Sequence, residues 1–271
     1  MKQNSIAILY IALGSYTCFW EEFYNSFESK FLTECDKDYY VFTDDRSFFL
    51  GCPGNVHVID QENLGWPGNT LYRFDMFLGI RERLFSADYI FFFNANYLCD
   101  MKVEPGDVGD LSYPLLCVTH PGFYGLKNNY FNYDRNKKSL AYVPYGKGQC
   151  YIQGCLLGGK PQTFLEMCEN LSKNIHIDDE HGVVAEWHDE SHVNRYIIDR
   201  QDVLVLGPGY AYPEFTPSER DYEPVLLLRD KEKYIEYKGK KKRSKYWLYY
   251  KIRKVQGFIH GLCGRRKCGN A

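Results

Sequence analysis

The chain has 271 residues, of which 45% are hydrophobic and 17% aromatic, and this composition excludes a wholly disordered protein. Its formal net charge of −2 conceals an uneven distribution, because residues 238–271 contain 12 of the 33 Lys and Arg residues and no Asp or Glu. The remaining body is acidic, which argues against a nucleic-acid-binding protein, so no nucleic-acid partner is expected.

The pattern of apolar residues predicts strands that alternate with helices. In chain order we expect a strand at 6–13, a helix at 18–31, strands at 39–43 and 56–59, a helix at 71–85, strands at 89–93 and 115–119, and helices at 161–174 and 182–198. Strands this apolar are typical of a largely parallel sheet that is covered on both faces. The sequence therefore predicts the α/β fold class.

Polar residues follow several of the expected strands. Tyr16 comes after the first strand, Asn94-Ala95-Asn96 follows the strand at 89–93, and His120 follows the strand at 115–119. Each of these segments is also compatible with an ordinary strand-ending turn. Because ligands of such sheets bind at the carboxyl ends of the strands, we expect a binding site at this edge.

The expected helix at 182–198 carries an unusual polar face. Trp187, Glu190 and Asn194 have the spacing that places side chains on one face of a helix. An aromatic ring, a carboxylate and an amide that project together suit the binding of a sugar.

Zinc binding is an alternative for the same segment. His188 and His192 have the i, i+4 spacing of zinc ligands, but the metalloprotease pattern places Glu directly after the first histidine, and Asp189 stands there instead. We therefore rank carbohydrate binding above zinc.

Three longer motifs together are more specific. They are HPGFYG at 120–125, YIQGCLLGG at 151–159 and WHDESHVN at 187–194. In this order and spacing they resemble glycosyltransferase family 6, which includes the ABO histo-blood-group transferases, the α1,3-galactosyltransferases and bacterial relatives. The resemblance covers about residues 5–230. It implies a catalytic domain at 1–237 with a GT-A fold, a Rossmann-like mixed sheet flanked by helices, and transfer with retention of the α-anomer.

The resemblance also implies roles for individual residues. Glu190 matches the catalytic carboxylate, which either stabilises an oxocarbenium-like transition state or attacks it to form a glycosyl-enzyme. His120 and Trp187 resemble residues that bind the acceptor galactose beside Glu190. The residues expected to contact a UDP-sugar donor are Ile11, Ala12, Leu13, Tyr16, Arg73, Asn94, Ala95, Asn96, Gln153, Gly154, Cys155, His188, Asp189, Arg229 and Lys231.

The choice of donor depends on the triplet Gln153-Gly154-Cys155, where the size of the residues decides whether an N-acetyl group fits. Cys155 is larger than the glycine of transferases that use N-acetylgalactosamine, which favours galactose, but Gln153 is unlike either subgroup. The donor therefore stays open between UDP-Gal and UDP-GalNAc. The family implies a β-galactoside acceptor that carries an α1,2-linked fucose.

One motif departs from the animal members of the family, which hold a divalent ion with an Asp-x-Asp motif. This chain has Asn94-Ala95-Asn96, and amides are poor ligands for such an ion without a neighbouring carboxylate. Bacterial members with Asn-x-Asn are metal-independent, so no metal cofactor is expected. The expected counter-charges for the leaving UDP are Arg73 and the run Arg229, Lys231 and Lys233.

Two other functions fit the same resemblance. One is a transferase that uses a different UDP-hexose, such as UDP-glucose. The other is a non-catalytic carbohydrate-binding module. Glu190 favours an enzyme, because binding alone does not require a carboxylate beneath the anomeric carbon.

The location of the protein is inferred from three features. No apolar run approaches the ~18 residues that span a bilayer, no signal segment precedes the first strand, and the ten cysteines lack disulfide or zinc patterns. We therefore expect a cytoplasmic protein with reduced thiols. The basic tail at 238–271 has the apolar spacing of an amphipathic helix on an anionic membrane, here the inner face of the cytoplasmic membrane, or of a solvated helix.

Overall fold

A seven-stranded mixed sheet forms the centre of the molecule, in the order β3-β2-β1-β4-β7-β6-β8. The computed structural model describes residues 4–214 and 221–235. The strands are β1 (Ser5–Ala12), β2 (Asp36–Thr43), β3 (Val56–Asp60), β4 (Tyr89–Phe93), β6 (Leu115–Thr119), β7 (Ile152–Gly159) and β8 (Val203–Leu206). Strand β7 runs antiparallel to both of its neighbours, and the other pairs are parallel.

Helices cover both faces of this sheet, as the alternation of side chains along β1 requires. Ile8 and Tyr10 pack toward one core with Phe23 of α1 (Trp20–Lys30), which follows the 3-10 turn η1 (Gly14–Phe19). Leu9, between them, packs toward the other core with Phe77. The second face carries α3 (Arg73–Leu78), α5 (Pro161–Glu180) and α6 (Asp189–Ile197). The predicted α/β class and the sheet flanked by helices are confirmed.

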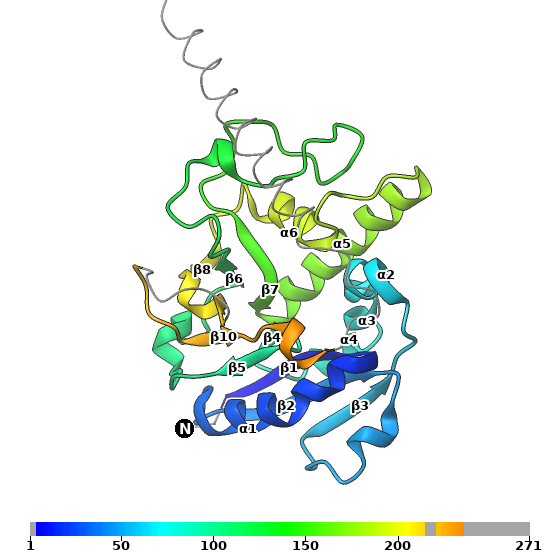
Figure 1. Cartoon of the computed structure of the whole chain (residues 1–271), viewed down its shortest axis with the longest axis vertical. Helices are drawn as coiled ribbons and strands as arrows, with labels where there is room; N and C mark the ends of the chain where they lie inside the picture. Colours follow the sequence, from blue (N-terminus) through cyan, green and yellow to red (C-terminus); the bar gives the residue numbers. More distant parts are fainter. Residues whose placement is uncertain (1–3, 215–220, 236–271) are drawn as a thin grey trace, which may run out of the picture.

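A small second sheet brings the C-terminal part of the described chain to the central one. Its order is β5-β10-β9, built from β5 (Tyr97–Cys99), β10 (Leu226–Leu228) and β9 (Tyr212–Pro213). The orange β10 segment runs beside β5, which directly follows β4 and the Asn94 turn (Figure 1). The short helix α7 (Lys231–Tyr234) then packs Tyr234 on Phe19 of η1, with ring centroids 5.3 Å apart.

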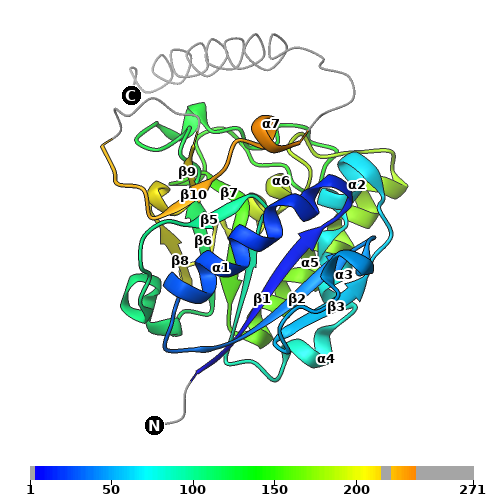
Figure 2. The same ribbon diagram turned by 60° about the horizontal axis from the view of Figure 1, so that its bottom comes forward.

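Several helices lie together at the end of the molecule toward which β1 points. Figure 2 shows α2 (Gly65–Leu71), α6 and α7 at this end. The carboxyl ends of the parallel strands and three separate helical segments therefore share one edge of the fold.

Some predicted elements were wrong in their boundaries. The helix expected at 182–198 begins only at Asp189, because Gly182 and His188 have positive φ angles of 66° and 52°. The helix expected at 71–85 is divided into α3 and α4 (Arg81–Leu84). Strand β7 was not predicted, although Gly159 is needed there, since a Cβ atom would lie 2.5 Å from the carbonyl oxygen of Pro114.

The predictions of reduced cysteines and of no membrane-spanning segment can be compared with the structure only within the described residues. The eight cysteines within 4–214 and 221–235 carry free thiols. No helix in these two ranges combines the length and the apolar character that crossing a bilayer requires. The basic tail at 238–271 lies outside the described residues, so its membrane contact stays a prediction.

Candidate active site

Glu190 stands in the first turn of α6. Both oxygens of its carboxylate accept hydrogen bonds, one from Gly154 of β7 and one from Tyr151, the residue directly before β7. The Tyr151 hydroxyl donates to Oε1 at 2.8 Å, and the backbone N–H of Gly154 donates to Oε2 at 2.9 Å. The residue keeps some solvent exposure, but protein atoms surround its carboxylate. This enclosure raises the pKa of Glu190 to about 7. The two hydrogen bonds lower the pKa, but their effect is smaller than that of burial.

An ion pair lies next to this carboxylate. Arg73 Nη2 is 3.1 Å from Asp189 Oδ2, and the two side chains are only 7% and 2% exposed. Arg73 also donates to the carbonyl oxygens of Gly154 and Thr70, at 2.9 and 3.0 Å. Burial raises the pKa of Asp189 to about 6, and Arg73 opposes this shift. Arg73 is thus a buried part of the site, and not a surface charge of α3.

The close packing of α6 on β7 depends on a glycine. A Cβ atom at Gly154 would lie 3.3 Å from Asp189 Oδ2 and 3.3 Å from Glu190 Cβ. Residue 154 can therefore bring its N–H to the carboxylate because it has no side chain.

The helical spacing predicted that Asn194 projects into the site together with Glu190, but this prediction was wrong, because its side chain bonds to the backbone of β7. Its Oδ1 accepts from the N–H of Ile152 and its Nδ2 donates to the carbonyl oxygen of Ile152, both at 3.0 Å. The same Nδ2 donates to the carbonyl oxygen of Glu190 at 2.9 Å. The amide therefore ties α6 to β7 and holds the backbone of Glu190.

Of the expected acceptor-binding residues, His120 lies beside Tyr151 of this network, and Trp187 directly precedes His188 and α6 in the chain. Trp187 precedes α6, so the prediction that it lies on the helix was wrong. Its backbone N–H donates to Ser191 Oγ at 3.0 Å. His120 accepts the N–H of Gly122 on Nδ1 at 3.0 Å, so the neutral ring carries its proton on Nε2. Its ring centroid is 5.8 Å from that of Tyr151.

The two histidines considered for zinc are directed to different neighbours. The ring of His188 packs on that of Trp66, with ring centroids 5.1 Å apart, and the sequence had not pointed to Trp66. His192 is buried, and its Nε2 lies 3.6 Å from Asp178 Oδ2. Within the part of the chain that the structure describes, no group of three or more His, Cys, Asp or Glu side chains could hold a metal ion.

The Asn94-Ala95-Asn96 turn connects the central sheet to the C-terminal segment. The N–H of Asn94 donates to the carbonyl oxygen of Cys155 at 2.8 Å, and the carbonyl oxygen of Ala95 accepts from Tyr10 at 3.1 Å. Asn96 Nδ2 donates to the carbonyl oxygen of Arg229 at 2.7 Å. The Asn96 amide is therefore engaged with the backbone that leads to α7.

The structure separates the three C-terminal cations. Arg229 is buried, forms an ion pair with Glu22, and has its guanidinium 4.7 Å from the ring centre of Phe19. Lys233 is exposed and lies 3.3 Å from Glu214. Lys231 forms no ion pair with an acidic side chain in the ranges 4–214 and 221–235. Its Nζ lies 5.2 Å from the ring centre of Tyr16.

Electrostatics distinguishes Lys231 further. Burial, and next the charge of Arg73, lower the pKa of its ammonium group. A cation in this position is desolvated and repelled by a second cation, so a nearby anion would be bound strongly.

The first-strand residues lie at the same edge. Ile11 and Ala12 end β1, and Leu13 leads into η1, where the N–H of Tyr16 donates to the carbonyl oxygen of Leu13 at 3.3 Å. Leu13 and Ala12 are buried, whereas Ile11 and Tyr16 are partly exposed. The structure therefore brings Tyr16 to Lys231, although 215 positions of sequence numbering separate them.

The three residues of the expected donor-selecting triplet have different surroundings. Gln153 Oε1 is buried and has no hydrogen-bond partner among the described residues. Cys155 is 1% exposed, and its Sγ lies 3.0 Å from the hydroxyl oxygen of Tyr97. Burial raises the pKa of the Cys155 thiol to about 12, so the group is a neutral part of the core beneath the Asn94 turn.

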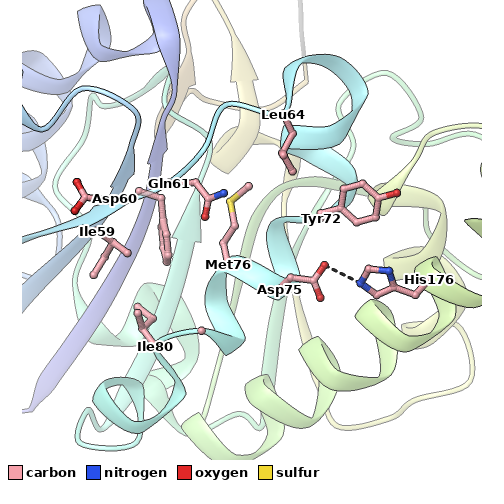
Figure 3. A pocket seen from close by; sticks show the side chains of 11 residues that line it. Ile59, Asp60, Gln61, Leu64, Tyr72, Asp75, Met76, Ile80 and His176 are labelled. Atoms are coloured by element: carbon pink, nitrogen blue, oxygen red, sulfur yellow. Dashed lines mark hydrogen bonds and ion pairs between the residues drawn. The ribbon is translucent and has the colours of Figure 1, made fainter.

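A pocket of about 440 Å³ lies on another part of the molecule, between β2, β3, α3 and α5 (Figure 3). Asp75 and His176, both of which line it, are hydrogen-bonded to each other at 3.1 Å. None of the candidate site residues lines this pocket, and Asp75 and Tyr72 already bond to α5. We therefore place the candidate active site at Glu190.

Comparisons with known proteins agree with this site. The model of the family described as Glycosyltransferase family 6 matches residues 1–237. The chain is 35% identical over 237 residues to the O-antigen biosynthesis glycosyltransferase WbnI of Escherichia coli, covering 88% of this chain and 99% of that protein. It is 28% identical over 220 residues to the human globoside alpha-1,3-N-acetylgalactosaminyltransferase 1, covering 79% of this chain and 62% of that protein.

A further relative is the rat histo-blood group ABO system transferase 1, which is 28% identical over 224 residues, with 79% of this chain and 62% of that protein covered. The chain therefore belongs to glycosyltransferase family 6. Its mixed sheet flanked by helices agrees with the GT-A fold expected for the family. Members of this family use a nucleotide-sugar donor and a glycan acceptor.

Proposed function

We propose that this chain transfers galactose or N-acetylgalactosamine from the UDP-sugar to a β-galactoside acceptor, with retention at the anomeric carbon and with Glu190 as the catalytic carboxylate. One observation supports this role above the others. Glu190 keeps some solvent exposure as a residue, and each oxygen of its enclosed carboxylate is fixed by a separate donor, Tyr151 and the backbone of Gly154.

The chemistry follows from the ionised form of Glu190. As the bond between the sugar and UDP breaks, positive charge develops at the anomeric carbon, and a fixed carboxylate beneath it stabilises that charge or forms a bond to the carbon. The enclosure of the site strengthens this interaction, because little water screens it. In this proposal the buried ion pair of Arg73 and Asp189, next to Glu190, binds hydroxyl groups of the transferred sugar.

We propose that transfer needs no divalent metal. The leaving UDP gains negative charge on its β-phosphate, and in this proposal Lys231 stabilises that charge, with Arg73 as a second cation. One observation supports it: Lys231 stands beside Tyr16 at the edge of the sheet.

The experiment that tests the function is a product assay. The purified full chain is incubated with UDP-Gal, UDP-GalNAc or UDP-Glc, each with lactose and with 2'-fucosyllactose, and the product anomer is identified by NMR. We expect an α-linked product from UDP-Gal or UDP-GalNAc, with more product from the fucosylated acceptor. A β-linked product, or no release of UDP from any donor, would overturn the proposal.

A further inference from the structure

Tyr151 bonds both to His120, which the family resemblance assigns to acceptor binding, and to Glu190, which it assigns to catalysis. Its backbone carbonyl oxygen accepts from the N–H of His120 at 2.8 Å, and its hydroxyl group donates to Glu190 Oε1 at 2.8 Å. One buried residue, 1% exposed, thus bonds both to the histidine expected at the acceptor and to the carboxylate. The distance between His120 and the Glu190 carboxylate therefore depends on Tyr151.

The ring of Tyr151 has little freedom to move. Its centroid lies 4.8 Å from that of Phe123, 5.4 Å from that of Tyr133 and 6.3 Å from that of Phe131, in a separate aromatic core cluster. Side chains packed in this way sit in one rotamer. The direction of the hydroxyl group toward Glu190 is therefore fixed before any substrate binds.

We infer that Tyr151 is a positioning residue, which holds the Glu190 carboxylate in its reactive orientation and keeps it ionised through the hydroxyl hydrogen bond. This inference rests on the catalytic role proposed for Glu190. Tyr151 itself acts through Glu190 and need not touch the substrate.

The effect on ionisation follows from the groups around Glu190. Arg73 faces it from α3 and Asp189 from α6, while Gly154 and Cys155 face it from β7. Burial favours the neutral acid, and the Tyr151 hydroxyl opposes burial because it donates to the ionised form. Removing this hydroxyl leaves the carboxylate enclosed with one donor fewer, so the pKa of Glu190 rises.

The test compares Tyr151→Phe with Tyr133→Phe. Tyr133 belongs to the same cluster, and its hydroxyl donates to the carbonyl oxygen of Cys150 instead of Glu190. Turnover of the UDP-sugar is measured from pH 5 to 9 in the full chain. We expect Tyr151→Phe to move the acid limb of kcat upward by about one to two pH units, and the donor KM to change by less than about twofold. Tyr133→Phe should leave the limb in place.

Poor folding of Tyr151→Phe would not decide the question, so a second replacement is needed. Replacing Tyr151 with 3,5-difluorotyrosine keeps the ring shape and makes the hydroxyl a stronger donor, and we expect the acid limb to move downward. If both replacements leave the limb where it is in the wild type, the inference is wrong.

The Glu190→Gln variant separates this inference from the proposed function. If Glu190→Gln retains full turnover, the catalytic role of Glu190 fails. If Glu190→Gln is inactive while Tyr151→Phe has the wild-type pH profile, only the role of Tyr151 fails.

Discussion

Asn96 and Arg229 are joined by two hydrogen bonds, in which both the backbone N–H and the backbone carbonyl oxygen of Arg229 bond to Asn96. The Asn96 side chain donates to the carbonyl oxygen of Arg229 at 2.7 Å, and the N–H of Arg229 donates to the carbonyl oxygen of Asn96 at 2.9 Å. Asn96, the last residue of the Asn94-Ala95-Asn96 turn, thus fixes the segment that carries Lys231.

This pair predicts the effect of restoring a carboxylate. Asp at position 96 cannot donate to the carbonyl oxygen and would place a negative charge against it, which costs about 1–3 kcal/mol. We expect Asn96→Asp to lower the melting temperature and to weaken UDP binding in metal-free buffer by about tenfold or more. Calorimetric titration with UDP measures the affinity, and thermal unfolding measures the melting temperature. Equal UDP affinity of Asn96→Asp and wild type would contradict the role of the Asn96–Arg229 hydrogen bonds in holding the segment that carries Lys231.

Lys231 and Lys233 provide a direct comparison of two cations on α7. We expect Lys231→Ala to reduce kcat/KM for the UDP-sugar by about tenfold to a thousandfold, because it removes the counter-charge of the leaving diphosphate. Lys233→Ala removes an exposed charge that is paired with Glu214, and its effect should be smaller by at least about tenfold. Equal losses in the two variants would refute the special role of Lys231.

The pH dependence of the wild-type enzyme follows from Glu190. Burial raises its pKa to about 7, and the proposed mechanism needs the ionised form. Activity should therefore fall as the pH drops through about 7, to about a hundredth of its plateau at pH 5. Steady-state kcat across this range is the measurement, with protein folding followed by circular dichroism. Constant kcat down to pH 5 in a folded enzyme would contradict the assignment.

Sequence patterns predicted the fold better than the fine structure of the site. Buried strands such as β4 and β6 were located because a run of apolar residues between helices has few other solutions. Strand β7 was missed because its glycines disfavour strands, yet Gly159 is required by the approach of the Pro114 carbonyl oxygen. The motifs identified Glu190, but the partners of Asn194, Asn96 and Tyr151 come from distant segments, and their geometry depends on packing that no local pattern contains.

Metal independence is a separate prediction. After treatment with EDTA and confirmation by elemental analysis that no metal remains, the enzyme should keep at least about half of its transfer rate, because Lys231 and Arg73 supply the positive charge. Added Mn²⁺ should change the rate by less than about twofold. Loss of activity on chelation, restored only by Mn²⁺ or Mg²⁺, would refute metal-free transfer.

The central claim, that Glu190 is the catalytic carboxylate of a family 6 transferase, is tested most directly by Glu190→Gln. The amide keeps the shape of the side chain but removes its charge, so UDP-sugar binding should stay within about threefold of wild type while kcat falls by more than about a thousandfold. The measurement is single-turnover release of UDP from a donor whose affinity for the same protein sample is known by calorimetry. The account predicts tight binding with almost no release, and near-wild-type release by the Gln variant would contradict it.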